Sequence, residues 1–84
     1  MKCIAILDSG NYVYMLESVL ERKGYKFEVI STPCHIAKGG CGLSLKFPEE
    51  FLEVVIAASL ESNTPIREVY RIVPTFSRTK YRRI

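Results

Sequence analysis

The sequence has no long hydrophobic run, and this lack sets the first limits on its class. No apolar stretch approaches the roughly 18 residues that a membrane-spanning helix needs. The start, MKCIAILDSG, has one lysine and only a short apolar run before Asp8, so we expect no signal peptide. We therefore expect a cytoplasmic protein without a membrane partner, whose three cysteines form no disulfide framework.

Motifs for catalysis are also scarce. The sequence has no phosphate-binding glycine loop of the usual spacing, no serine with a recognisable base partner, and a single histidine. The acidic pair Glu49 and Glu50 is better explained by the positive N-terminal end of a helix than by acid–base chemistry. Outside the segment 31–47 described below, nothing therefore suggests an enzyme, and we expect no cofactor.

The charges are unevenly distributed along the 84 residues. All 9 acidic residues precede Pro74, whereas 4 of the 12 lysines and arginines follow it, so the first part carries about −1 and the last ten residues +4. We predict a single domain over residues 1–74 and a solvated basic tail over residues 75–84. Such a tail is available to nucleic acid or to an acidic partner.

Hydrophobic periodicity predicts two helices among four strands. The expected strands are KCIAIL, KFEVISTP, LSLKF and IREVYRIV, and the expected helices cover residues 11–23 and about 48–62. In the first helix the apolar stripe consists of Tyr12, Leu16, Val19 and Leu20, with Gly24 closing the helix in the left-handed conformation.

The resulting order, βαββαβ, predicts an α+β fold of the ferredoxin-like kind. Such a fold has a four-stranded antiparallel sheet with both helices on one face. In the first strand, Ile4 and Ile6 point to the face opposite Cys3, so this strand is apolar on both sides. We therefore predict a homodimer, formed through the open face of the sheet or by exchange of the tail.

The segment STPCHIAKGGCGLSLKF, residues 31–47, concentrates the residues with reactive side chains. A reactive thiol needs exposure, a lowered pKa and room for a partner to approach. The segment offers candidates for each need: Cys34 and Cys41 as thiols, His35 and Lys38 to favour a thiolate, and Gly39, Gly40 and Gly42 to give room. Three alternatives stay open: a zinc site that uses Cys34, His35 and Cys41, a dithiol–disulfide pair, and a plain turn.

The same segment resembles the small bacterial and archaeal family called putative selenium/sulfur carrier protein-like. The resemblance rests on Thr32-Pro33 at the end of a strand, a short stretch of small and polar residues, and Cys41-Gly42 before an alternating strand. The later segments PEEFLEVV and EVYRIV are similar to the second helix and last strand of that family.

This resemblance implies that Cys41 accepts sulfur or selenium as a persulfide or perselenide, and that the partners are a donor protein and an acceptor protein. The sequence departs from the family pattern near this cysteine. Cys34 stands where a basic residue is expected, and Gly39 and Gly40 stand where serines are expected. The competing function is a small interaction module whose basic tail binds nucleic acid or a protein.

Overall fold

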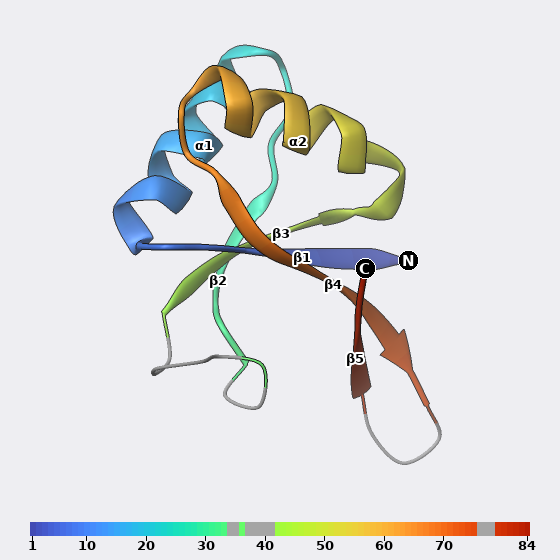
Figure 1. Cartoon of the computed structure of the whole chain (residues 1–84). Coiled ribbons are helices and arrows are strands. Elements are labelled where there is room, and N and C mark those ends of the chain that lie inside the picture. Colours follow the sequence, from blue (N-terminus) through green and yellow to red (C-terminus); the bar gives the residue numbers. More distant parts are fainter. Residues whose placement is uncertain (34–35, 37–41, 76–78) are drawn as a thin grey trace.

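The computed structural model describes residues 1–33, 36, 42–75 and 79–84. Within these residues, the elements follow one another as β1 (Lys2–Leu7), α1 (Gly10–Arg22), β2 (Glu28–Ser31), β3 (Leu43–Pro48), a 3-10 turn (Glu49–Phe51), α2 (Leu52–Glu61), β4 (Ile66–Pro74) and β5 (Thr79–Arg83). The strands form an antiparallel sheet in the order β2-β3-β1-β4-β5 (Figure 1). None of the helices in the described ranges is long and apolar enough to cross a membrane.

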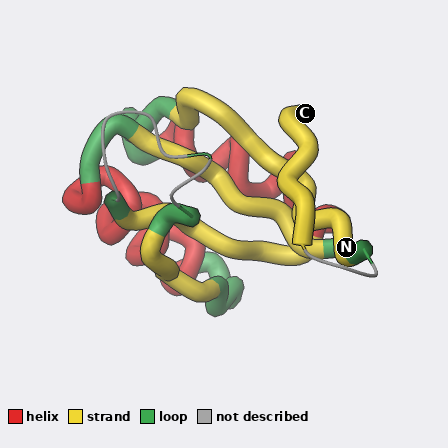
Figure 2. Tube along the Cα trace, turned by 90° about the horizontal axis from the view of Figure 1, so that it is seen from below, coloured by secondary structure: helices red, strands yellow, loops and turns green. Residues whose placement is uncertain are grey.

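Both α1 and α2 lie on the same face of the sheet, and the main core fills the space between these layers (Figure 2). The core combines alternate residues of β1 and β3 with one stripe of each helix. Its buried members are Cys3, Ala5, Leu7, Val13, Leu16, Leu20, Leu45, Phe47, Val55 and Ala58. The alternation predicted for residues 43–47 is confirmed, because Leu45 and Phe47 are buried in this core and Leu43 packs against it.

Helix α1 forms near its predicted position, and Leu16, Leu20 and Val19 of its predicted stripe contribute to the core. The side chain of Ser9 accepts a hydrogen bond from the backbone N–H of Tyr12, which caps the first turn. The buried stripe is Val13, Leu16 and Leu20, whereas Tyr12 is 36% exposed, so its predicted place in the core is wrong. Gly24 has a φ of 93° just beyond the helix, which confirms the left-handed ending.

The predicted fold class is wrong, because the described residues form a five-stranded sheet rather than the four-stranded sheet of a ferredoxin-like βαββαβ fold. The extra strand comes from the segment that we predicted as a solvated tail. Residues Thr79–Arg83 pair with β4 in antiparallel register, from Pro74↔Thr79 to Tyr70↔Arg83. The order in the described chain is therefore β-α-β-β-α-β-β.

The face of the sheet opposite the helices carries a second apolar cluster, which we call the open-face cluster. It consists of Ile4, Ile36 and Tyr70, with Ile6, Ile30, Ile72 and Tyr81 packed against them at partial exposure. The sidedness predicted for β1 is thus confirmed, since Ile4 lies in this cluster and Cys3 in the main core. Ile4 is only 1% exposed within a single chain, because residues of the same chain pack over it.

Candidate functional site

The loop between β2 and β3 is the candidate site that the sequence indicates. Most of the predicted site residues lie outside the described residues: Cys34, His35, Lys38, Gly39, Gly40 and Cys41. The described residues nearest to them are Pro33 and Ile36 within the loop and Gly42 at its end. The part of the site that the structure describes is therefore where the loop is attached to the sheet.

The two ends of the loop are joined by hydrogen bonds. The backbone N–H of Thr32 donates to the carbonyl oxygen of Gly42 at 2.7 Å, one step beyond the last paired residues, Ser31↔Leu43. The hydroxyl groups of Thr32 and Ser44 form a second, side-chain hydrogen bond, and both residues are buried. Since a buried hydroxyl without a partner is costly, each of these hydroxyls holds the other in place. The base of the loop is thus fixed by backbone and side chain together.

Ile36 attaches the loop to the open face of the sheet. Its side chain is 8% exposed and belongs to the open-face cluster with Ile4 and Tyr70. Its backbone N–H donates to the carbonyl oxygen of Pro33 at 3.1 Å, which joins the two described residues of this part of the chain. The burial of Ile36 therefore attaches the chain at this position to β1 and β4.

Gly42 is exposed, and its conformation differs from the one expected of a turn glycine. Among the glycines described, positive φ occurs at Gly24 and not at Gly42. A Cβ added at Gly42 would meet nothing within 4 Å. Neither backbone strain nor crowding therefore requires a glycine at this position.

Cys3 is the cysteine that the structure does place, and its position makes it unreactive. Its side chain is 0% exposed at the second position of β1. Burial raises the pKa of the Cys3 thiol, and the nearby Glu49 carboxylate raises it further. Because the thiolate is the reactive form of cysteine, Cys3 is both inaccessible and protonated at neutral pH.

Sequence reasoning missed the contacts that hold the loop. Ser44 was placed on the polar side of an alternating strand, yet it is fully buried and lies opposite Ile6 and Ile30 in the register. A serine between two β-branched apolar neighbours is a signal of burial, but only once the strand register is known. Ile36 offered a similar signal, as an isolated apolar residue in a polar loop.

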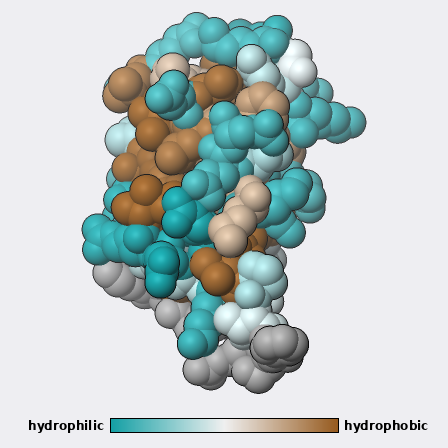
Figure 3. Space-filling view, turned by 90° about the vertical axis from the view of Figure 1, so that its right-hand side faces the viewer, coloured by the Kyte–Doolittle hydropathy of each residue, from teal (hydrophilic) through white to brown (hydrophobic). Residues whose placement is uncertain are grey.

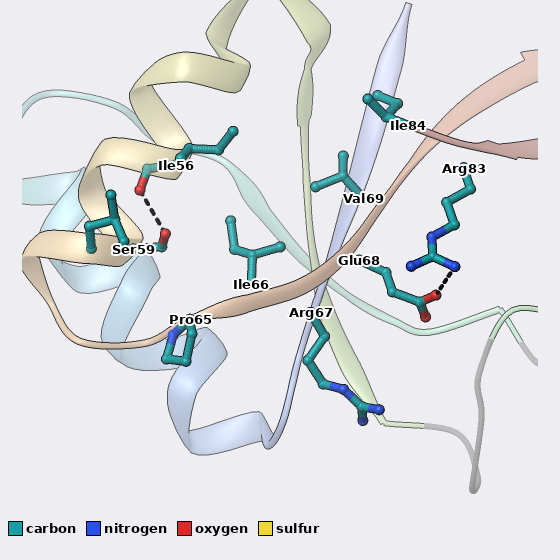
Figure 4. A pocket seen from close by; sticks show the side chains of 10 residues that line it. Ile56, Ser59, Pro65, Ile66, Arg67, Glu68, Val69, Arg83 and Ile84 are labelled. Atoms are coloured by element: carbon teal, nitrogen blue, oxygen red, sulfur yellow. Dashed lines mark hydrogen bonds and ion pairs between the residues drawn. The ribbon is translucent and has the colours of Figure 1, made fainter.

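A pocket of about 330 Å³ lies away from this loop, between α2 and the first residues of β4. Its apolar lining includes Ile56, Leu60, Ile66, Val69 and Ile84 (Figure 4). Arg83 lies at this pocket and forms an ion pair with Glu68 at 3.4 Å. The pocket adjoins the helix-covered face of the sheet, whereas Ile36 lies on the opposite face, so the two features are separate.

Apolar side chains are also exposed on the surface. The most exposed of those lining the pocket are Leu60, Ile84 and Ile56. Figure 3 shows, on one side of the molecule, an area of hydrophobic surface surrounded by polar residues.

The described residues hold no cluster of three or more histidine, cysteine or acidic side chains suited to a metal ion. The zinc alternative involves Cys34, His35 and Cys41, which lie outside the described ranges.

The chain was compared with known proteins in three ways. The model of a family described as "Putative Se/S carrier protein-like" matches residues 2–71, which include the whole loop and the strands on either side of it. A search of curated proteins and a search of solved structures each gave no match. The family match includes β1 to most of β4 and does not extend to β5.

Proposed function

Since the chain belongs to the putative Se/S carrier protein-like family, we propose that it carries sulfur or selenium on a cysteine of the β2–β3 loop. The carrier residue in this proposal is Cys41, which accepts the chalcogen from a donor protein and passes it to an acceptor protein. Cys34 is a secondary thiol in the same loop. The supporting residues are His35, Lys38, Gly39, Gly40 and Gly42.

The observation that carries this proposal is the burial of Cys3. A carrier cysteine must be reached by both partner proteins, and Cys3 lies in the central strand with no exposed surface. The other two cysteines both lie in the loop, within the segment that the family model matches. Anchoring by Thr32, Ser44 and Ile36 supports the proposal further, because it attaches the loop to a rigid sheet at both ends.

The chemistry requires one nucleophile and no cofactor. The Cys41 thiolate attacks the outer sulfur of a persulfide on the donor protein, so a new S–S bond forms on Cys41 while the donor S–S bond breaks. The donor cysteine leaves as a thiolate, and no net oxidation or reduction takes place. Transfer to the acceptor repeats the same exchange with Cys41 as the leaving group. A perselenide follows the same balance.

Mass spectrometry of variants in which one cysteine is replaced tests this proposal. Incubation of the wild type with a cysteine desulfurase and cysteine should add one sulfur atom, and Cys34→Ser should also gain it. Cys41→Ser should gain none. The matched control is Cys3→Ala, which should gain sulfur as the wild type does, since Cys3 is buried.

The proposal is overturned if Cys41→Ser and the wild type take up sulfur equally. It is also overturned if neither sulfur nor selenium is transferred to the wild type by persulfide or perselenide donors. Uptake on Cys34 alone would assign the carrier role to the other thiol of the loop and would contradict the role given to Cys41.

A further inference from the structure

Strand β5 forms an edge of the sheet and carries an unusual concentration of positive charge. The sheet order ends with β5, and no described residue pairs with its outer side. Its sequence, TKYRR, has three basic residues and no acidic one. An edge strand of this kind presents backbone N–H and C=O groups that another extended chain can use.

The register shows which backbone groups of β5 point outward. The N–H of Ile84 donates to the carbonyl oxygen of Val69 at 2.9 Å, in line with the pairing Tyr70↔Arg83. Hydrogen-bonded and non-hydrogen-bonded pairs alternate along an antiparallel ladder. Lys80 and Arg82 therefore direct their backbone groups toward β4, whereas Thr79 and Arg83 direct theirs away from the sheet.

Two of the three cations on β5 have no acidic partner among the described residues. Arg83 pairs with Glu68 at 3.4 Å. Arg82 lies directly opposite Arg71, and the carboxylate of Glu49 already accepts two hydrogen bonds from Arg71. Lys80 lies opposite Val73. Like charges directly across a sheet are unfavourable, so Arg82 and Arg71 repel each other, and no described acidic residue neutralises Arg82 or Lys80.

The two sides of β5 differ in character, and this difference defines the pattern that fits them. Tyr81 is half-buried against the open-face cluster, opposite Ile72. Lys80 and Arg82 are exposed and point to the other face. In a strand added to β5, residues opposite Tyr81 would extend the apolar cluster, and residues opposite Lys80 and Arg82 would meet positive charge.

We propose that the outer edge of β5 binds an extended segment of a partner protein in which acidic and apolar residues alternate. The acidic side chains neutralise Lys80 and Arg82, the apolar side chains continue the open-face cluster, and the backbone pairs with Arg83 and Thr79. A second copy of the chain is a poor occupant, because two β5 strands would bring cations against cations. Nucleic acid is also a poor fit, since it offers no strand to pair with this edge.

Fluorescence anisotropy with short labelled peptides tests the proposal on the full chain. The probe alternates glutamate and valine, and its matched control has lysine in place of each glutamate. The glutamate peptide should bind about tenfold or more tightly than the lysine peptide, and its affinity should fall with added salt. Binding should also slow amide hydrogen exchange at Arg83.

Charge-reversal variants locate the site. Arg82→Glu should weaken binding of the glutamate peptide by about tenfold or more, whereas Lys26→Glu, an exposed lysine outside β5, should change it little. Arg83→Pro, which removes an outward N–H, should weaken binding more than Arg83→Gln, which keeps it.

The proposal is overturned if neither peptide binds, if the lysine peptide binds equally well, or if Arg82→Glu and Lys26→Glu have equal effects. If the chain bound a labelled oligothymidylate more tightly than the glutamate peptide, the proposal would also be overturned, in favour of nucleic acid. Sulfur transfer to Cys41 enters none of these measurements, so either proposal can fail alone.

Discussion

Glu49 begins the 3-10 turn before α2, and its carboxylate links this turn to β4 of the sheet. It accepts hydrogen bonds from Nε and Nη2 of Arg71 at 2.7 and 2.8 Å. This hydrogen bonding holds the pKa of Glu49 below its ordinary value, and the charge of Arg71 lowers it further. The sequence predicted a role for Glu49 at the positive end of a helix, but it gave no sign of an arginine on β4. The interaction that lowers the pKa of Glu49 most comes from Arg71, which is 22 positions further along the chain.

Replacing Glu49 with glutamine should reveal this pair through the pH dependence of stability. The pKa of Glu49 is lower in the folded state than in the unfolded state, so its charge stabilises the fold above the unfolded pKa of about 4.3. That contribution is lost as the pH falls through the folded pKa. In urea denaturation, Glu49→Gln should therefore be less stable than the wild type at pH 7, and the difference should narrow in acid.

The control for this measurement is Glu50→Gln, a change at the neighbouring exposed carboxylate. Glu50→Gln should change the free energy of unfolding little at either pH. A Glu49→Gln difference that stays constant from neutral to acidic pH would show that the charge of Glu49 does not stabilise the fold.

Among the elements, the β2–β3 loop depends on a single apolar contact within its described part. Ile36 packs against Ile4 and Tyr70, and these two residues are buried in turn. Ile36→Ala should therefore lower the free energy of unfolding by about 2 kcal/mol, near the lower end for a buried isoleucine, because the cluster lies at the edge of the core. Chemical denaturation measures this loss.

The same substitution separates anchoring of the loop from its chemistry. If Ile36 holds the loop in the form that partners recognise, Ile36→Ala should also slow sulfur uptake under conditions where the protein stays folded. The matched control is Ile56→Ala, at an exposed apolar residue on α2, which should change stability little. Equal losses of stability in both variants would contradict the anchoring role of Ile36.

The elements could be predicted from the sequence where the contacts that form them are local. The apolar run KCIAIL and the alternation over residues 43–47 predicted β1 and β3, and the residues of each strand that lie in the main core were expected on one face. Strand β5 was missed, because TKYRR shows no apolar alternation beyond Tyr81, and its pairing with β4 is not visible in its own composition. The hydrogen bond between Thr32 and Ser44 was missed for the same reason, since it joins the residue after β2 to β3. The roles of Cys34 and Cys41 stay predictions.

For the molecule as a whole, β5 completes the sheet and helps to cover its open face. Tyr81 packs against the open-face cluster opposite Ile72. Removal of residues 75–84 should therefore expose Ile72 and Tyr70, lower the melting temperature by several degrees, and promote self-association. Differential scanning calorimetry and light scattering at several protein concentrations measure the two effects.

A matched variant keeps the strand and removes two of its three positive charges. Lys80→Ser combined with Arg82→Ser leaves Tyr81 in place, so it should not expose the cluster. A truncated chain with the melting temperature of the wild type and no greater self-association would contradict the covering role of β5. The homodimer stays a prediction, and the mass of the full chain by light scattering tests it.

The place of β1 in the sheet has a consequence for synthesis of the protein. β1 is made first, yet it lies between β3 and β4, and both of its neighbours are made much later. Until they leave the ribosome, the nascent chain carries a strand that is apolar on both faces and has unpaired backbone groups on both edges. Such a strand is prone to wrong pairing, so we expect β1 to be the segment that chaperones shield most during translation.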